Sequence, residues 1–272
     1  MSLASDIFAL YSFEPLDTRL MNLSARQEKI VALFRQHGSI SVDSLASHFA
    51  VTSQTIRRDI NALCDANVLR RHHGGAKLAA PGLNQPYEVR RVGNLEGKVR
   101  IGTAAGQLIP DGSSVLIGIG TTPEQVAVAL IKHERLTIIT NNLRAALALS
   151  MQPSHRIIVP GGQLRSPNPE ILGVEADQLF RNHRADFGVY GVGGIDDDGT
   201  LLDYDRHEAA SREALRDSCR SRILVVDASK FSRKPSVRGG HLTDQDILIT
   251  DAEPPPQFDD MLRDRVRVVV AL

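Results

Sequence analysis

Apolar residues recur at helical spacing in three runs near the start of the chain, at 24–37, 42–49 and 53–66. In the first run, Ser24 and Gln27 have the spacing of a capping box. Only a short turn separates the second run from the third. The pattern therefore predicts three amphipathic helices, the last two of which form a helix-turn-helix.

Short strand patterns follow the third helix. Apolar and basic residues at 68–71 and 76–78 predict two strands, and the glycine-containing stretch 72–75 predicts the turn between them. Three helices followed by a hairpin are typical of a winged helix-turn-helix, which we place at 24–80. Residues 1–23 have no clear period, so we expect either a disordered leader or a start that is set too early.

From position 98 the pattern changes to nearly continuous apolar runs that alternate with amphipathic segments. Strands are expected at 115–119, 137–140, 157–160, 187–191, 223–226, 247–250 and 266–271, and helices at 123–132, 143–151, 174–182 and 205–218. Continuous apolar strands separated by helices predict a mostly parallel sheet covered on both faces, and hence an α/β domain over 98–272. Proline and glycine are frequent at 81–97, which predicts a linker.

Charge is distributed unevenly, although the net charge is zero. Residues 24–80 hold eight Lys and Arg against four Asp and Glu, so this part carries +4 and the remainder −4. A basic first domain predicts double-stranded DNA as a partner. No stretch has the length of a membrane span or the pattern of a secretory signal, so we expect a cytoplasmic protein. The two cysteines, Cys64 and Cys219, fit neither a disulfide framework nor a metal site, and no cofactor is expected.

The start of the third helix carries polar and basic side chains. These positions enter the major groove in a helix-turn-helix, where Gln can pair with adenine and Arg with guanine. A solvated helix face is the alternative interpretation, but the basic hairpin favours DNA binding. His72 and His73 could contact phosphate or serve only as turn residues. The expected DNA-binding residues are Ser53, Gln54, Thr55, Arg57, Arg58, Arg70, Arg71, His72 and His73.

A glycine- and threonine-rich turn follows the first strand of the α/β domain. In this turn, Thr122 is expected as the helix N-cap and Pro123 as the first helical residue. Free amides at a helix start favour an anion such as phosphate. The same strand-to-helix turn also occurs in α/β domains that bind no ligand there. The residues at the other strand ends therefore decide whether a ligand site is expected.

Polar or glycine residues follow the other strands, and ligands of open α/β sheets bind at these carboxyl ends. Lys230 would supply a cation, whereas Asp203 and Glu208 would accept hydroxyl protons. Helix capping is the alternative role for Asp205. A small phosphorylated metabolite is therefore the expected ligand, held by Gly120, Thr121, Thr122, Asn141, Asn142, Gly161, Gly162, Asp203, Glu208 and Lys230.

Together and in this order, the motifs resemble the DeoR family of bacterial repressors from Ser24 to Leu272. The resemblance is carried by residues 53–59, 72–76, 120–122, 140–142, 161–162, 186–188 and 227–231. It implies a sensor domain related to ribose-phosphate isomerases, operator binding as a homo-oligomer, and release of DNA when the metabolite binds. Residues 119–124 and 194–199 are most similar to repressors of glycerol 3-phosphate metabolism, so glycerol 3-phosphate is the expected effector.

Three positions depart from the family pattern. Gly118 replaces the usual acidic residue, Arg206 an aromatic residue, and Ser232 the usual glycine, which affects the expected hydroxyl contacts of the ligand. The alternatives are a repressor that responds to another sugar phosphate and a sugar-phosphate isomerase with an appended DNA-binding domain. Catalysis would require a general base with a suitable position and pKa, whereas a polyol effector would require the same residue types. We therefore expect a repressor that is not an enzyme.

Overall fold

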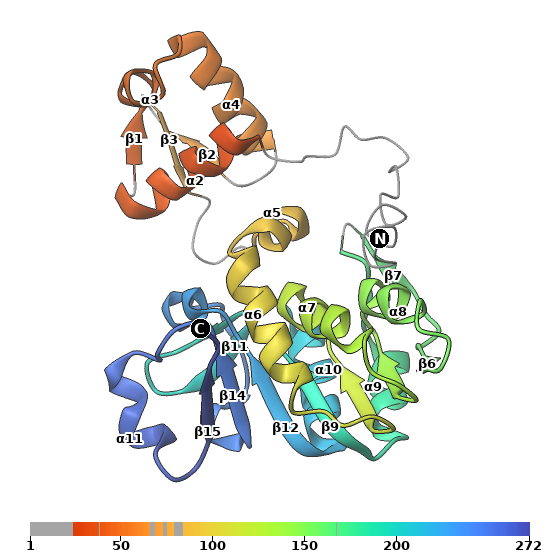
Figure 1. Ribbon diagram of the computed structural model, residues 1–272. Coiled ribbons are helices and arrows are strands. Elements are labelled where there is room, and N and C mark those ends of the chain that lie inside the picture. Colours follow the sequence, from red (N-terminus) through yellow and green to blue (C-terminus); the bar gives the residue numbers. More distant parts are fainter. Residues whose placement is uncertain (1–23, 38, 66–68, 73–74, 79–83, 167) are drawn as a thin grey trace, which may run out of the picture. The chain divides into compact units, whose positions relative to one another are not determined.

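The computed structural model describes residues 24–272 except positions 38, 66–68, 73–74, 79–83 and 167 (Figure 1). The chain divides into two compact units, Met1–Ala79 and Ala80–Leu272, and each is described by itself. The leader expected at 1–23 lies outside the described residues. Among the described helices, none has both the length and the apolar character needed to cross a membrane.

The first unit contains the three predicted helices and a small sheet. Its elements are α2 (Ala25–His37), β1 (Ser39–Ser41), α3 (Val42–Phe49), α4 (Ser53–Asp65), β2 (Leu69–His72) and β3 (Gly75–Leu78). The capping box is confirmed, because the Ser24 N–H donates to Gln27 Oε1 at 2.9 Å and the Gln27 N–H donates to Ser24 Oγ at 3.2 Å. Both predicted strands of the hairpin are present within one residue of their expected starts.

The apolar faces of the three helices form the core of the first unit. Ile30, Phe34, Leu45, Ile56 and Leu63 are completely buried. The sheet is antiparallel in the order β1-β3-β2. The strand β1 is absent from the sequence prediction, because three residues that include two serines show no alternating pattern. The winged helix-turn-helix is thus confirmed, with one additional strand.

A seven-stranded parallel sheet forms the centre of the second unit. Its strands are β4 (Ser114–Ile117), β5 (Thr137–Thr140), β6 (Arg156–Ile158), β9 (Ala185–Tyr190), β12 (Cys219–Val225), β14 (Ile247–Thr250) and β15 (Arg267–Val270). They lie in the order β15-β14-β12-β9-β4-β5-β6, and all neighbouring pairs are parallel. Each overlaps a predicted strand, so the parallel α/β fold is confirmed.

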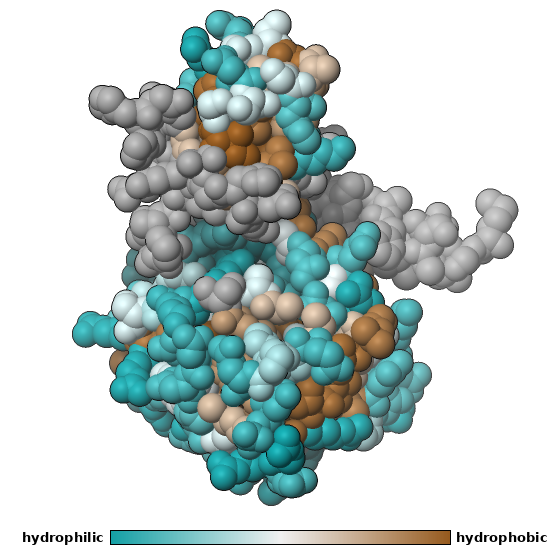
Figure 2. Space-filling view, turned by 90° about the vertical axis from the view of Figure 1, so that its left-hand side faces the viewer, coloured by the Kyte–Doolittle hydropathy of each residue, from teal (hydrophilic) through white to brown (hydrophobic). Residues whose placement is uncertain are grey.

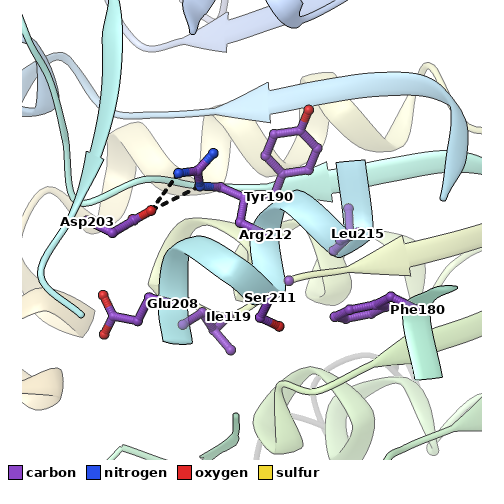
Figure 3. A pocket seen from close by; sticks show the side chains of 10 residues that line it. Ile119, Phe180, Tyr190, Asp203, Glu208, Ser211, Arg212 and Leu215 are labelled. Atoms are coloured by element: carbon purple, nitrogen blue, oxygen red, sulfur yellow. Dashed lines mark hydrogen bonds and ion pairs between the residues drawn. The ribbon is translucent and has the colours of Figure 1, made fainter. Parts of the chain in front are cut away.

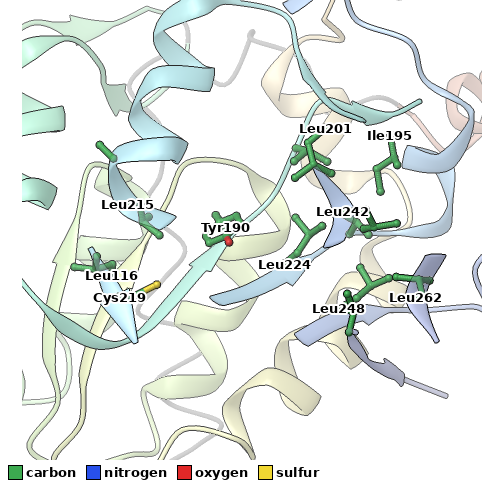
Figure 4. Packing of buried hydrophobic residues seen from close by; sticks show 14 of the residues in the cluster. Leu116, Tyr190, Ile195, Leu201, Leu215, Cys219, Leu224, Leu242, Leu248 and Leu262 are labelled. Carbon is green, nitrogen blue, oxygen red and sulfur yellow. The ribbon is translucent and has the colours of Figure 1, made fainter. Parts of the chain in front are cut away.

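Helices cover both faces of this sheet (Figure 1). The helices are α6 (Leu95–Gly106), α7 (Thr121–Leu130) and α8 (Leu143–Leu149) on one face and α9 (Val174–Arg181) and α10 (Arg206–Asp217) on the other. Side chains of β4 alternate between the two faces: Val115 packs in the cluster beneath α6–α8, and Leu116 in the cluster beneath α10 (Figure 4). The strand is therefore buried on both sides, which explains its continuous apolar sequence.

Several smaller elements surround the sheet. They are the antiparallel strands β10 (Gly194–Ile195), β11 (Thr200–Asp203) and β13 (Val237–His241), the hairpin β7 (Leu164–Arg165) with β8 (Glu170–Ile171), the 3-10 turns η1 (Ala228–Ser232), η2 (Leu242–Asp244) and η3 (Pro256–Phe258), and the helix α11 (Asp259–Leu262). None was predicted, because runs of two to five residues are too short to show a period. On the outer surface of the unit, apolar side chains gather in patches among hydrophilic ones (Figure 2).

The linker expected at 81–97 is in part wrong. Within it lie α5 (Tyr87–Val92) and the start of α6. Tyr87 and Val89 are buried, and the Lys98 ammonium donates to the carbonyls of Arg90 and Gly93, the latter at 2.6 Å. α5 therefore packs as part of the second unit. Its six residues are too few for a helical period, and Pro86 and Gly93 at its ends suggested a loop.

Candidate functional site

The start of α4 presents the expected DNA-reading side chains. Gln54, Arg57 and Arg58 are exposed, and neither arginine makes a hydrogen bond or ion pair through its side chain in the part of the chain that the structure describes. Ser53 and Thr55 are half-buried: Ser53 Oγ donates to Asp43 at 3.0 Å, and the hydroxyl of Thr55 lies 2.9 Å from that of Thr52. The two arginines and Gln54 are thus available to a ligand, whereas Ser53 and Thr55 also support the turn.

The opposite side of α4 is held against α2. Asp59 is buried, and its carboxylate accepts hydrogen bonds from Arg26 Nε at 2.6 Å and Gln27 Nε2 at 3.3 Å. This ion pair leaves Arg57 and Arg58 as the exposed cations of the helix. In the wing, the backbone of Arg70, Arg71 and His72 lies in β2, their side chains are not described, and His73 lies outside the described residues.

In the second unit, the turn after β4 differs in detail from the prediction. Gly120, not Thr122, is the N-cap of α7, and the helix begins at Thr121, so Pro123 is the third helical residue. Gly120 has φ of 113°, a conformation that side chains disfavour, which explains why the helix starts immediately after the glycine. Thr121 and Thr122 are buried in the first turn of α7. The amides of this turn still form the start of a ten-residue helix, as an anion site requires.

Asn142 supports this turn. Its Nδ2 donates to the Gly120 carbonyl at 3.3 Å, and its Oδ1 caps α8 by accepting the Ala145 N–H at 3.2 Å. Asn142 therefore positions the backbone of the turn from the end of β5. Asn141, the preceding residue, is also buried and donates to Ile171 O at 3.0 Å and Ser211 Oγ at 3.1 Å, while its Oδ1 has no hydrogen-bond partner among the described atoms.

A cluster of cations lies beside this turn. Lys230, in η1, has its pKa lowered to about 7, first by burial and then by the nearby charge of Arg233; Arg90 and Lys98 act in the same direction. Lys98 is only 4% exposed. Of these four cations, only Lys230 was predicted from the sequence. Arg90 and Lys98 were missed because they lie in or next to the presumed linker, and the helical spacing of Lys98, Ile101 and Ala105 was the available signal.

Two buried carboxylates lie within electrostatic range of Arg90. Glu170 in β8 and Glu208 in α10 are bridged by Arg165, at 3.4 Å and 2.8 Å respectively. Burial raises the pKa of both carboxyl groups, and the charge of Arg165 opposes this rise. Arg90 is within electrostatic range of Glu170, Glu208 and Arg233, so the carboxylates and the cation cluster form one continuous polar site.

A small pocket extends this site beneath the start of α10 (Figure 3). Its lining includes Gly118, Tyr190, Glu208 and Ser211. A Cβ at Gly118 would lie 3.3 Å from Leu215 and from Tyr190, so glycine at this position leaves room between β4 and α10. Glu208 and Ser211 thus offer a carboxylate and a hydroxyl to a small polar molecule.

Asp203 has a different environment from the one predicted. Arg212 donates to its carboxylate through Nη2 at 2.6 Å and Nε at 3.2 Å, and the Gly193 N–H donates at 3.1 Å. Both residues are buried, so this ion pair links β11 to α10 and would be costly to separate. The Asp203 carboxylate already accepts three hydrogen bonds, whereas the Glu208 carboxylate is paired only with Arg165 among the described residues. Glu208 is therefore the better acceptor for a ligand hydroxyl.

The remaining predicted residues, Gly161 and Gly162, and the alternative role of Asp205 have separate outcomes. Gly161 and Gly162 are exposed after β6, and a Cβ at Gly162 would lie 3.3 Å from Ile171 and 3.8 Å from Glu175. Asp205 caps α10 by accepting the His207 N–H at 2.7 Å, which is the structural role considered for it. Within the described residues, no group of three or more His, Cys, Asp and Glu side chains is arranged to hold a metal ion.

Comparisons with known proteins match both units. A model of the DeoR-like helix-turn-helix domain matches residues 26–81, and a model of the DeoR C terminal sensor domain matches residues 93–252. Among solved structures, ribose 5-phosphate isomerase A from Methanocaldococcus jannaschii matches 52% of this chain and 56% of its own, with 16% identity and a TM-score of 0.38. A similarity at that level says nothing about activity.

Curated relatives match over nearly the whole chain. The glycerol-3-phosphate regulon repressor of Escherichia coli is 42% identical over 90% of this chain and 97% of its own length. The repressor of the same name from Haemophilus influenzae is 43% identical over 86% and 91%. The HTH-type transcriptional repressor CsqR of Escherichia coli is 39% identical over 88% and 92%. This chain therefore belongs to the DeoR family of helix-turn-helix transcriptional repressors.

Proposed function

We propose that this repressor leaves its operator when glycerol 3-phosphate binds to the sensor domain. The observation that supports the proposal is a cluster of cations, Lys98, Lys230 and Arg233 with Arg90, within electrostatic range of buried carboxylates. The Lys98 ammonium and the Thr121 hydroxyl at the start of α7 both donate to the Arg90 carbonyl, which places Lys98 next to that helix start. Two relatives that match at 42% and 43% identity are named as repressors of the glycerol-3-phosphate regulon. The repressor acts in the cytoplasm and has operator DNA as its second partner.

The two ends of the polar site suit the two ends of a short polyol phosphate. The phosphate charge is matched by the amides at Thr121 and Thr122 and by Lys230, whose ammonium has no hydrogen-bond partner among the described residues. The hydroxyl groups are matched by Glu208 and by the unpaired Oδ1 of Asn141. Tyr190 and Leu215 line the pocket and keep it small, which favours a three-carbon ligand over a larger sugar phosphate.

Induction requires the effector to distinguish two states of the repressor. A ligand that binds the DNA-bound and DNA-free states equally shifts neither population, however tightly it binds. A preference of about 5.5 kcal/mol for the DNA-free state would move the population from 1:99 to 99:1.

The test is operator release in a fluorescence-anisotropy titration, with an operator selected from random DNA by the purified repressor. Glycerol 3-phosphate should release the DNA at a lower concentration than fructose 1-phosphate or ribose 5-phosphate. Glycerol should release none, because it lacks the anion that the cations and helix amides bind. The choice of effector is wrong if either sugar phosphate acts at a clearly lower concentration, and Gly118 and Arg206 would then be the first positions to examine.

We further propose that the protein has no isomerase activity and binds DNA as a homo-oligomer. Glu170 and Glu208 have raised pKa values, as a general base would, but Arg165 already pairs with both carboxylates. Exposed apolar side chains at Leu147 and Met151 on or just after α8 support association of copies. A coupled isomerase assay and light scattering of the purified repressor test these two statements.

A further inference from the structure

The short helix α5 lies directly on the proposed phosphate site. The Lys98 ammonium donates to the carbonyls of Arg90 and Gly93, which are at the carboxyl end of α5. Thr121 Oγ1, in the first turn of α7, donates to the Arg90 carbonyl at 3.4 Å. The Tyr87 hydroxyl, at the other end of α5, donates to Glu124 Oε2 in α7. α5 is thus attached to α7 at one end and to both the phosphate turn and Lys98 at the other.

These contacts place carbonyl oxygens on donors that an anion would use. The last carbonyls of a helix lack intrahelical partners and carry partial negative charge. In this position they resemble, weakly, the oxygens of a bound phosphate. A phosphate that approached the start of α7 would compete with Arg90 O and Gly93 O for the Lys98 ammonium and the Thr121 hydroxyl. Because a phosphate has a full negative charge, it would form the stronger charge-assisted hydrogen bonds.

The place of α5 along the chain connects this competition to DNA binding. α5 is the first described helix after the boundary between the two units, and only residues 80–86 separate it from that boundary. The amino end of α5 is continuous with the segment that joins the sensor domain to the helix-turn-helix domain, so displacement of α5 would be transmitted to that segment.

We propose that α5 is an internal occupant of the phosphate site, and that the effector induces the repressor by displacing its carboxyl end. α5 is docked in the DNA-binding state and undocked in the effector-bound state. Docking of α5 and binding of the effector therefore exclude each other, which provides the differential affinity that induction needs. This inference rests on the proposed function and deepens it by naming the element that moves.

The first test weakens docking without altering a group that would contact the effector. Tyr87→Phe removes the hydrogen bond to Glu124. The effector should then release operator DNA at a concentration roughly threefold to tenfold lower, the factor expected from one ordinary hydrogen bond. Thr103→Val is the matched control, because it removes a hydroxyl that donates at 3.0 Å to the Val99 carbonyl on the exposed side of α6, away from α5. An unchanged release concentration in Tyr87→Phe would overturn the inference.

The second test needs no effector. Val89 is 4% exposed, so Val89→Asp would bury a carboxylate and undock α5. This variant should lose operator affinity at least tenfold without effector, while its circular dichroism spectrum stays that of the wild type. Wild-type operator affinity, together with faster amide exchange at residues 87–93, would show that undocking does not release DNA and would refute the inference.

Hydrogen exchange on the full-length wild type separates this inference from the choice of effector. Binding of glycerol 3-phosphate, verified by calorimetry, should speed amide exchange at residues 87–93, and slower exchange there would contradict the inference. If glycerol 3-phosphate does not bind, the proposed effector is wrong. Loss of operator affinity in Val89→Asp would in that case still support α5 as the element that controls release.

Discussion

At the scale of single residues, the helix α4 carries charged side chains of two kinds, exposed and buried. Arg57 and Arg58 are exposed, and their side chains make no hydrogen bond or ion pair within the described structure, so their charge is available to DNA. Asp59, on the same helix, is buried and paired with Arg26. The helix therefore has a side that packs and a side that can enter a groove, which is the arrangement that a recognition helix requires.

Loss of one base-reading arginine should weaken operator binding. Arg57→Ala or Arg58→Ala should cost about 1–3 kcal/mol at the base pair that the arginine reads, while the effector concentration needed for release stays unchanged. The measurement is anisotropy with the operator and with single-base variants of it. Arg263→Ala, which removes an exposed arginine paired with Asp260, is the control and should bind like the wild type. Wild-type affinity in both α4 variants would show that this helix does not read the operator.

The charge of Lys230 should make effector binding depend on pH. Burial and Arg233 lower the pKa of Lys230 to about 7, so the ammonium loses its proton as pH rises through this value. Effector affinity should therefore fall between about pH 6 and pH 8, above the second pKa of a phosphate monoester near 6. Calorimetry across this range measures the decline, and Lys230→Met should bind more weakly and show a flatter profile. A wild-type affinity that rises with pH would contradict the assignment.

The same shift has a consequence for stability, and its sign follows from the direction of the shift. Because the folded-state pKa of Lys230 lies below the unfolded value of about 10.4, charging Lys230 destabilises the folded state. This cost is fully present below about pH 7 and disappears as pH rises toward the unfolded pKa. Lys230→Met should accordingly gain stability relative to the wild type at low pH.

At the scale of elements, the site depends on where helices start and end. α7 begins at Thr121 because Gly120 adopts a positive φ, and Asn142 at the end of β5 holds the Gly120 carbonyl. The carboxyl end of α5 meets the amino end of α7 through Arg90 O. The negative end of one helix dipole therefore meets the positive end of another. At this point an anion can compete with the Arg90 carbonyl for the donors of α7.

Removal of the two hydroxyls at the start of α7 should strongly weaken the response to glycerol 3-phosphate while largely preserving operator binding. Thr121→Val with Thr122→Val retains the shape of two buried side chains and deletes their donors. We expect release to require at least tenfold more glycerol 3-phosphate, because two hydrogen bonds to a charged group are lost. Operator affinity without effector, measured by anisotropy, should fall only slightly, by about threefold or less, because the Thr121 contact to the Arg90 carbonyl is one long hydrogen bond among several that dock α5. If this double variant releases the operator at the wild-type effector concentration, the start of α7 is not the phosphate site.

At the scale of the whole molecule, two units with different charge divide the work of a repressor. Residues 24–80 carry +4 and the rest −4, so the net charge of zero hides a basic DNA-binding part. The two family models match these two parts separately. Operator affinity and effector affinity can therefore be altered independently, except by residues of α5 and of the segment that joins the units.

The sequence alone determined the architecture of both units. The helices of the first unit and the seven parallel strands of the second were predictable, because each has either a helical period or a continuous apolar run. The glycine-threonine turn after β4 and Lys230 at the end of another strand could also be singled out from the sequence, because ligands of open α/β sheets bind at the carboxyl ends of strands, and their role in binding stays a prediction. The DeoR family resemblance followed from the order of these motifs and is confirmed by the comparisons.

Tertiary structure decided which of these residues are free to act. Asp203 is paired with Arg212, Asn142 holds the turn, and Asp205 caps a helix. Glu208 lines the pocket and is also paired with Arg165. Arg90 was not predicted for this site, because α5 is too short to show a period and becomes helical by packing on α7. Lys98, near the start of α6, was missed because it lies next to the expected linker. Hydrophobic periodicity reports which face of an element is buried, but partners distant in sequence determine whether a polar side chain is already paired.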